Sequence, residues 1–124
     1  MTVLLVEDEA KMAALLRRAL GGVGLDVDVA ERGEAAVEMA GKLAYEAAVL
    51  DVALPGIDGI EVCRRLRHDE FAGPILLMSV SGTVDSREAG IEAGADLYLV
   101  KPFHLSELVN GLRDLMRKHP PIRA

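Results

Sequence analysis

The sequence predicts a doubly wound α/β fold in which five parallel strands alternate with five helices. Three observations favour this fold: short apolar runs recur along the 124 residues, segments with helical spacing of apolar residues follow them, and glycine or proline separates most segments. Strands that alternate with helices of this length imply parallel pairing and right-handed crossovers. Four of the five strands are apolar throughout, so helices are expected on both faces of the sheet.

The first half of the chain carries three of the predicted strands. Residues 3–6 and 47–50 are continuous apolar runs, as expected for strands that are buried on both faces. Residues 25–29 alternate apolar and acidic side chains, which is typical of a strand near a sheet edge. Placing that strand at the edge gives the strand order 2-1-3-4-5.

Three helices are predicted around these strands. Residues 34–40 are rich in alanine, and residues 60–66 place apolar side chains on one side and basic ones on the other. The first helix is predicted from five apolar side chains that share one face: Met12, Leu15, Leu16, Ala19 and Leu20.

The second half of the chain repeats the same alternation. The apolar runs at residues 75–78 and 97–100 predict the fourth and fifth strands. The helix between them, at residues 84–93, is weak because Gly90 interrupts it. Residues 105–116 keep apolar side chains at helical spacing, and Pro120 and Pro121 are expected to end this last helix.

The composition indicates one globular domain, with 51% apolar and 27% charged residues. A net charge of −6 argues against binding nucleic acid through the overall field of the domain. The single cysteine, Cys63, excludes an internal disulfide and fits a reducing compartment. No apolar stretch approaches the roughly 18 residues of a membrane span, and no signal peptide is recognisable. We therefore expect a cytoplasmic domain without a membrane partner.

Polar side chains follow four of the predicted strands, where parallel strands share one edge of the sheet. They are Glu7 and Asp8, Asp51, Ser79 and Lys101. Crowded carboxylates need neutralisation, and Mg²⁺ prefers carboxylate oxygens together with waters and phosphate oxygens. An aspartate beside a metal and a lysine can also attack phosphorus and form an aspartyl phosphate. Each residue taken singly could equally be a helix cap or a turn residue.

Four motifs extend this pattern: Val6-Glu7-Asp8, residues 51–59, Ala93-Gly94-Ala95-Asp96 and residues 98–103. With these motifs the chain resembles, over residues 2–118, the receiver (CheY-like) domain of two-component response regulators, a flavodoxin-like fold. Within that family it is most similar to the OmpR/PhoB-like branch.

The resemblance implies that Asp51 accepts a phosphoryl group from a sensor histidine kinase in a Mg²⁺-dependent reaction. It also implies that Glu7, Asp8 and Asp51 bind the Mg²⁺ together with the backbone carbonyl of Ala53. By the same resemblance, Lys101 contacts the phosphoryl group, and the Lys101–Pro102 peptide bond is cis.

The resemblance further assigns Ser79 as the switch hydroxyl and Tyr98 as the switch aromatic, whose ring would rotate inward from the surface. The face made by the fourth helix, the fifth strand and the last helix would then change shape for a partner. The related branch often forms homodimers through salt bridges on this face. Here Leu97 and Gly111 stand where one such bridge would lie, which argues against that ion pair and leaves an apolar dimer face open.

The expected domain organisation is a receiver at residues 1–118, with residues 119–124 starting a linker or forming a C-terminal tail. The output is expected to be a DNA-binding transcription-regulator domain absent from this chain, so contact with DNA would occur only through that domain. A receiver of this kind is not an enzyme in the ordinary sense, since it has only self-phosphorylation and self-dephosphorylation chemistry.

Three alternatives stay open at this stage. The first is a single-domain regulator that docks on another protein. The second is a Mg²⁺-dependent phosphohydrolase, which usually needs a second acid/base carboxylate at the position where this chain has Ala53. The third is a flavin-binding domain, whose ligand phosphate the acidic site would repel.

Overall fold

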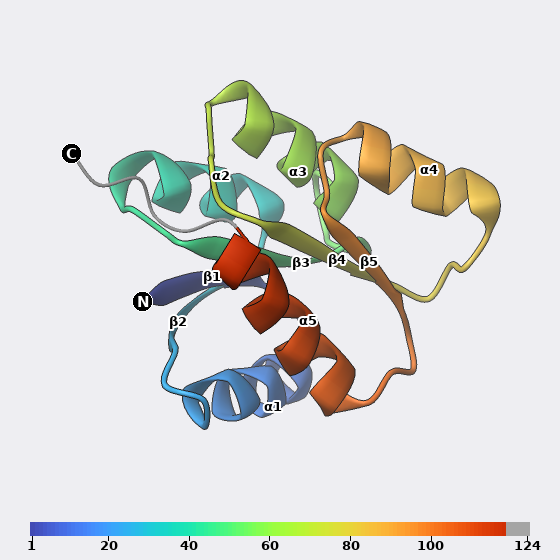
Figure 1. Cartoon of the computed structure of the whole chain (residues 1–124). Helices are drawn as coiled ribbons and strands as arrows, with labels where there is room; N and C mark the ends of the chain where they lie inside the picture. Colours follow the sequence, from blue (N-terminus) through green and yellow to red (C-terminus); the bar gives the residue numbers. More distant parts are fainter. Residues whose placement is uncertain (119–124) are drawn as a thin grey trace.

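Five strands form one parallel sheet in the order β2-β1-β3-β4-β5 in the computed structural model, which describes residues 1–118 (Figure 1). The predicted fold class and strand order are therefore confirmed. The strands are β1 (Thr2–Val6), β2 (Asp26–Ala30), β3 (Ala47–Asp51), β4 (Ile75–Ser79) and β5 (Leu97–Val100). The expected linker or tail at residues 119–124, with the prolines expected to end the last helix, lies outside the described residues.

Five helices cover the two faces of the sheet, as Figure 1 shows. One face carries α1 (Ala10–Gly21) and α5 (Leu105–Lys118). The other carries α2 (Gly33–Lys42), α3 (Gly59–His68) and α4 (Val84–Glu92). Each helix begins and ends within two residues of the range predicted from the sequence, and most of them are slightly longer than predicted.

The three central strands supply side chains to both layers. Val3 and Leu5 of β1 pack in the core beneath α1 and α5, whereas Leu4 and Val6 pack in the core beneath α2 and α3. All four side chains are fully buried. This alternation explains why the strand is apolar at every one of these positions, since each face of a central parallel strand is covered.

The edge strand β2 follows its alternating sequence. Val27 is buried, Asp26 is exposed, and Asp28 is partly exposed. Tyr45 donates a hydrogen bond from its hydroxyl to Asp28 Oδ2 at 2.8 Å. The acidic side chains of this strand therefore keep access to solvent, as expected for a strand at the edge of the sheet.

The buried stripe of α1 differs in part from the predicted one. Ala13, Leu16 and Leu20 are the buried residues of this helix, but Leu15 is 45% exposed. The expectation that Leu15 faces the core is therefore wrong. Spacing placed Leu15 at the margin of the apolar face, and the helix is rotated so that Ala13 takes the inner position.

Leu97 and Gly111 lie against one another between β5 and α5. A Cβ atom added at Gly111 would come within 2.7 Å of Leu97 Cδ2. A side chain at position 111 would therefore compete with the leucine for the same space. Within residues 1–118, no helix has the length and apolar character required to cross a membrane.

Candidate functional site

Strand register brings the predicted polar residues to one edge of the sheet. Val6 pairs with Leu50, so Glu7 lies level with Asp51, the last residue of β3. Asp51 pairs in turn with Met78, one residue before Ser79 at the end of β4. Carboxyl ends of parallel strands are where open α/β sheets place their ligand sites.

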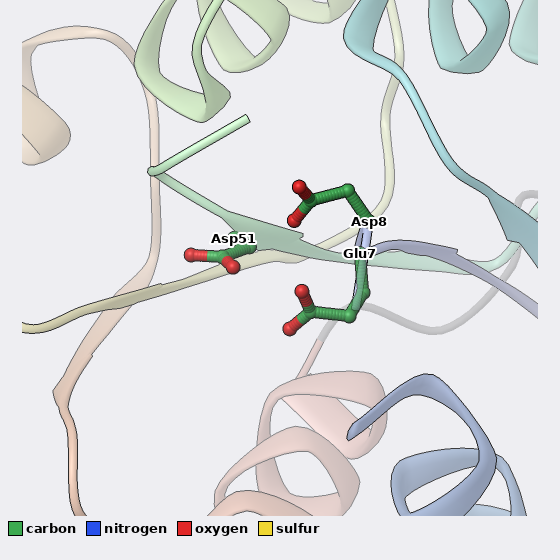
Figure 2. Close-up of side chains that lie close together, drawn as sticks. All are labelled: Glu7, Asp8 and Asp51. Carbon is green, nitrogen blue, oxygen red and sulfur yellow. The ribbon is translucent and has the colours of Figure 1, made fainter. Parts of the chain in front are cut away.

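Three carboxylates converge at this edge. Glu7, Asp8 and Asp51 each offer an oxygen, and these oxygens all lie within 4.8 Å of one another. Figure 2 shows the three side chains reaching toward the same region from the ends of β1 and β3. Glu7 and Asp51 are 2% and 5% exposed, whereas Asp8 is exposed to solvent. The cluster is thus open on the side of Asp8.

Glu7 is the most constrained member of the cluster. Its Oε2 accepts a hydrogen bond from the backbone N–H of Glu9 at 3.2 Å. Its Oε1 is buried and has no hydrogen-bond partner among the described residues. Burial raises the pKa of Glu7 to about 7, and the neighbouring Asp51 adds to the rise, against the lowering effects of the Glu9 amide and Lys101. A buried anion in this position calls for more positive charge than the protein supplies.

Lys101 supplies the cation of the site. Its Nζ lies 3.1 Å from Asp51 Oδ2, within hydrogen-bond distance. The same Nζ is 3.7 Å from Glu7 Oε1, which is close enough for an ion pair but too long for a hydrogen bond. The backbone N–H of Lys101 donates to the carbonyl of Ser79 at 2.7 Å, and the Lys101–Pro102 peptide bond is cis.

The residues present fit a hard divalent cation. Three carboxylates with one lysine leave an excess of negative charge, and the unpartnered oxygen of Glu7 belongs to the same cluster. Oxygen ligands of this kind suit Mg²⁺, which combines a few carboxylates with waters and phosphate oxygens. The pattern lacks the imidazole and thiolate ligands that a structural zinc site uses.

The loop after β3 holds the backbone around Asp51 in place. The N–H of Ala53 donates to Asp51 Oδ1 at 3.2 Å, and the N–H of Gly59 donates to the carbonyl of Val52 at 2.9 Å. A Cβ atom at Gly59 would overlap the carbonyl oxygen of Asp51, so glycine permits this close approach. Asp58 then caps α3 by accepting from the N–H of Glu61 at 2.8 Å.

Ser79 and Tyr98 lie behind the carboxylates, and both are buried. Ser79 is 5% exposed and Tyr98 is 6% exposed. The hydroxyl of Tyr98 donates to the carbonyl of Ser81 at 2.7 Å. The expectation that the ring of Tyr98 starts at the surface is therefore wrong, because its ring packs in the core beneath α4 and its polar end has a partner inside the protein.

Sequence reasoning missed two residues next to this site. Thr83 caps α4 by accepting from the N–H of Ser86 at 3.1 Å, and the hydroxyl of Ser86 lies 2.7 Å from that of Ser81. Thr83 before a helix was a recognisable capping signal. The contact of Ser86 with Ser81 had no sequence signal, since it depends on how the loop folds back.

Residues 3–113 match the family of response regulator receiver domains. The chain therefore belongs to the response regulator receiver domain family, as its motifs predicted. It is a signalling domain of two-component response regulators, a family in which phosphorylation and Mg²⁺ binding are general.

The relatives include regulators of transcription. The chain is 51% identical over 118 residues to the transcriptional regulatory protein TcrA of Mycobacterium tuberculosis, covering 95% of this chain and 47% of TcrA. It is 43% identical over 121 residues to the response regulator MprA of Mycobacterium leprae, covering 98% of this chain and 53% of MprA. The chain thus spans about half the length of the curated relatives it matches.

Solved receiver structures share the fold. The receiver domain of the Francisella response regulator 1452 superposes with a TM-score of 0.91 at 28% identity, covering 96% of this chain and 98% of that one. TrrA of Thermotoga maritima, solved in complex with Mg²⁺-BeF, superposes with a TM-score of 0.83 at 32% identity, covering 92% of this chain and 97% of TrrA.

Proposed function

We propose that Asp51 is the phosphoacceptor of this receiver domain. The observation that carries the proposal is the position of Asp51, which is 5% exposed at the end of β3, with Lys101 Nζ 3.1 Å from one carboxylate oxygen and two further carboxylates beside it. A nucleophilic carboxylate, a fixed cation and a cluster of oxygen ligands for a metal are the parts that phosphoryl transfer to an aspartate needs.

In the proposed reaction an Asp51 carboxylate oxygen attacks the phosphorus of a phosphorylated donor. The bond from phosphorus to the donor breaks as the new bond to Asp51 forms, and the donor leaves with the electron pair of the broken bond. Lys101, which contacts Asp51, would balance negative charge on the phosphoryl oxygens, and the hydroxyl of Ser79, at the end of the next strand, would donate to them. Hydrolysis of the acyl phosphate later returns the carboxylate.

Glu7, Asp8 and Asp51, with the backbone carbonyl of Ala53, are the proposed ligands of Mg²⁺. When bound, the ion would supply positive charge to the phosphoryl oxygens. The buried, unpartnered oxygen of Glu7 supports this assignment, and so does the complex of the related TrrA with Mg²⁺-BeF. Glu7 would serve mainly to complete the charge of the site, since Asp8 is the solvent-facing member.

The proposed donor is a sensor histidine kinase, and Ser79 and Tyr98 are the proposed switch residues. They would change the α4-β5-α5 face, which is also a proposed apolar homodimer interface, since Leu97 and Gly111 argue against an ion pair there. We place the receiver at residues 1–118 in the cytoplasm. The output would be a DNA-binding domain outside this chain, because TcrA, a transcriptional regulator, is about twice as long as the matched region.

The test is the intact mass of the protein after incubation with Mg²⁺ and acetyl phosphate. We expect a gain of one phosphoryl group, about 80 Da from its atomic composition, in the wild type and none in Asp51→Asn. Removing Mg²⁺ with a chelator should prevent the gain. Labelling of Asp51→Asn to the same extent as the wild type would show that another residue is the acceptor.

A further inference from the structure

Three hydroxyl groups gather between the end of β4 and the start of α4. Ser81 Oγ lies 2.7 Å from Ser86 Oγ and 3.4 Å from Thr83 Oγ1. Thr83 Oγ1 in turn donates to Ser86 Oγ at 2.9 Å. Ser81 and Ser86 are partly buried, and Ser86 lies in the first turn of the helix. The cluster therefore joins the loop after β4 to the body of α4.

Ser81 also contacts both proposed switch residues through its backbone. Its N–H donates to Ser79 Oγ at 3.0 Å, and its carbonyl accepts from the Tyr98 hydroxyl at 2.7 Å. One residue thus links the hydroxyl of Ser79, the ring of Tyr98 and the start of α4. Within residues 1–118, the hydrogen bonds from Ser81 to the start of α4 come from its side chain, mainly through Ser86.

Apolar contacts do little to hold this loop. Val80 is 78% exposed and Val84 is 68% exposed, so neither flank of residues 81–83 is anchored in the core. The position of the loop consequently depends on its hydrogen bonds. Because hydrogen bonds have preferred distances and angles, they restrict the position of Ser81 more than non-directional apolar contacts would.

We propose that Ser86 is a positioning residue of the switch: by holding the side chain of Ser81, it fixes the resting places of the Ser79 hydroxyl and the Tyr98 ring. Ser86 acts through Ser81 and touches none of the reacting atoms. The proposal rests on the proposed function for the meaning of Ser79 and Tyr98 as switch residues. The contacts of Ser86 with Ser81 are those of the protein without a phosphoryl group.

The contacts give this arrangement a consequence for switching. If the Ser79 hydroxyl turns toward a phosphoryl oxygen, the N–H of Ser81 loses its acceptor. The Ser81–Ser86 contact then determines whether Ser81 stays beside α4. If Ser81 stays there, its carbonyl remains in position to accept the hydrogen bond from the Tyr98 hydroxyl. Weakening that contact should free Ser81 and Tyr98 before any phosphoryl transfer takes place.

Tyrosine fluorescence can report on this directly, since the chain has two tyrosines and no tryptophan. In a Tyr45→Phe background Tyr98 is the only fluorophore, and acrylamide quenching measures its exposure. We expect Ser86→Ala to raise the quenching constant of Tyr98. We also expect amide hydrogen exchange at Ser81 to accelerate about fivefold, the change that corresponds to the loss of one ordinary hydrogen bond.

Two matched variants separate positioning from a general effect on folding. Ser106→Ala makes the same substitution in the exposed first turn of α5 and should leave both readouts unchanged. Ser86→Thr keeps a hydroxyl and should restore the protected values. Equal quenching and equal Ser81 exchange in Ser86→Ala and the parent would overturn the proposal. Neither readout uses a phosphoryl donor, so a failure of Asp51 labelling would count against the proposed function alone.

Discussion

Helices α4 and α5 flank the same edge of the sheet but are attached to it by different forces. Helix α5 runs for 14 residues and buries Leu108 and Leu112 completely. Helix α4 runs for 9 residues, and Gly90 is its only buried residue. Its larger apolar side chains, Val84 and Ile91, are 68% and 53% exposed. Apolar burial therefore fixes α5, whereas α4 depends on its cap, its backbone and the hydroxyl cluster.

The difference suggests which part of the molecule can move. Regions with few buried apolar contacts open at lower free energy than the core, and switching elements are drawn from such regions. Arg67 stabilises the segment that follows the C-terminal end of α4. Its guanidinium donates to the carbonyl of Gly94 at 2.9 Å and to Asp96 Oδ2 at 2.9 Å. We therefore expect motion of α4 to be largest at its first turn, next to Ser81 and Tyr98.

The largest expected difference between the two helices comes from truncating one apolar side chain in each of them. Leu112→Ala should lower the free energy of unfolding by about 2–5 kcal/mol, because it leaves a cavity in the core beneath α1 and α5. Ile91→Ala removes a mostly exposed side chain and should change that free energy by less than about 0.5 kcal/mol. Urea denaturation measures both. Similar losses for the two variants would mean that α4 is packed as firmly as α5.

Glycine substitutions in the two helices sharpen the comparison. A Cβ atom at Gly90 would lie 2.9 Å from Leu77 Cδ1 and 3.0 Å from Tyr98 Cδ2, both buried. Gly90→Ala should therefore displace the ring of Tyr98 and cost about 1–3 kcal/mol of stability, less the helix propensity that alanine gains.

Gly111→Ala is the matched control. Its Cβ would meet only the end of the Leu97 side chain, which can rotate away, so we expect stability to change little or to rise by up to about 1 kcal/mol. Urea denaturation gives the stabilities, and acrylamide quenching in the Tyr45→Phe background gives the exposure of Tyr98. Unchanged quenching in Gly90→Ala would show that α4, rather than the ring, moves to make room.

The smallest effect concerns Cys63, through which α3 contacts the end of α4. Its thiol is fully buried and lies 3.5 Å from the carbonyl of Ala93, and burial raises its pKa to about 11. An unfolded thiol ionises at its ordinary pKa of about 8.5, whereas the folded thiol stays protonated, so stability falls as pH rises between these two values.

Cys63→Ala isolates this contribution. Between about pH 8.5 and about pH 9.5 the wild type should lose about 1 kcal/mol more than Cys63→Ala in urea denaturation. All other titrating groups are common to the two proteins and cancel in the difference. Parallel pH profiles for the two proteins would mean that the thiol ionises in the folded state at its ordinary pKa, and that the contact with Ala93 is open much of the time.

The sequence alone determined the order of the elements and the edge where the site lies. Apolar runs at residues 3–6, 47–50 and 75–78 are typical of strands covered on both faces, and the alternating residues 25–29 are typical of a strand near an edge, as the sheet order confirms. Once the strands are parallel, their carboxyl ends must meet, so Glu7, Asp51 and Lys101 come together for topological reasons. These features depend on the local spacing of apolar and polar residues, which can be seen directly in the sequence.

Only the tertiary structure decided the rotation of α1, the inward position of Tyr98 and the partners of Ser81. Leu15 and Ala13 compete for the inner face of α1, and the close packing against the sheet selects alanine. Tyr98 can lie inward because Gly90 leaves room for its ring and the Ser81 carbonyl accepts from its hydroxyl. Such contacts join residues that are far apart in the sequence, and their geometry follows from packing rather than from any local pattern.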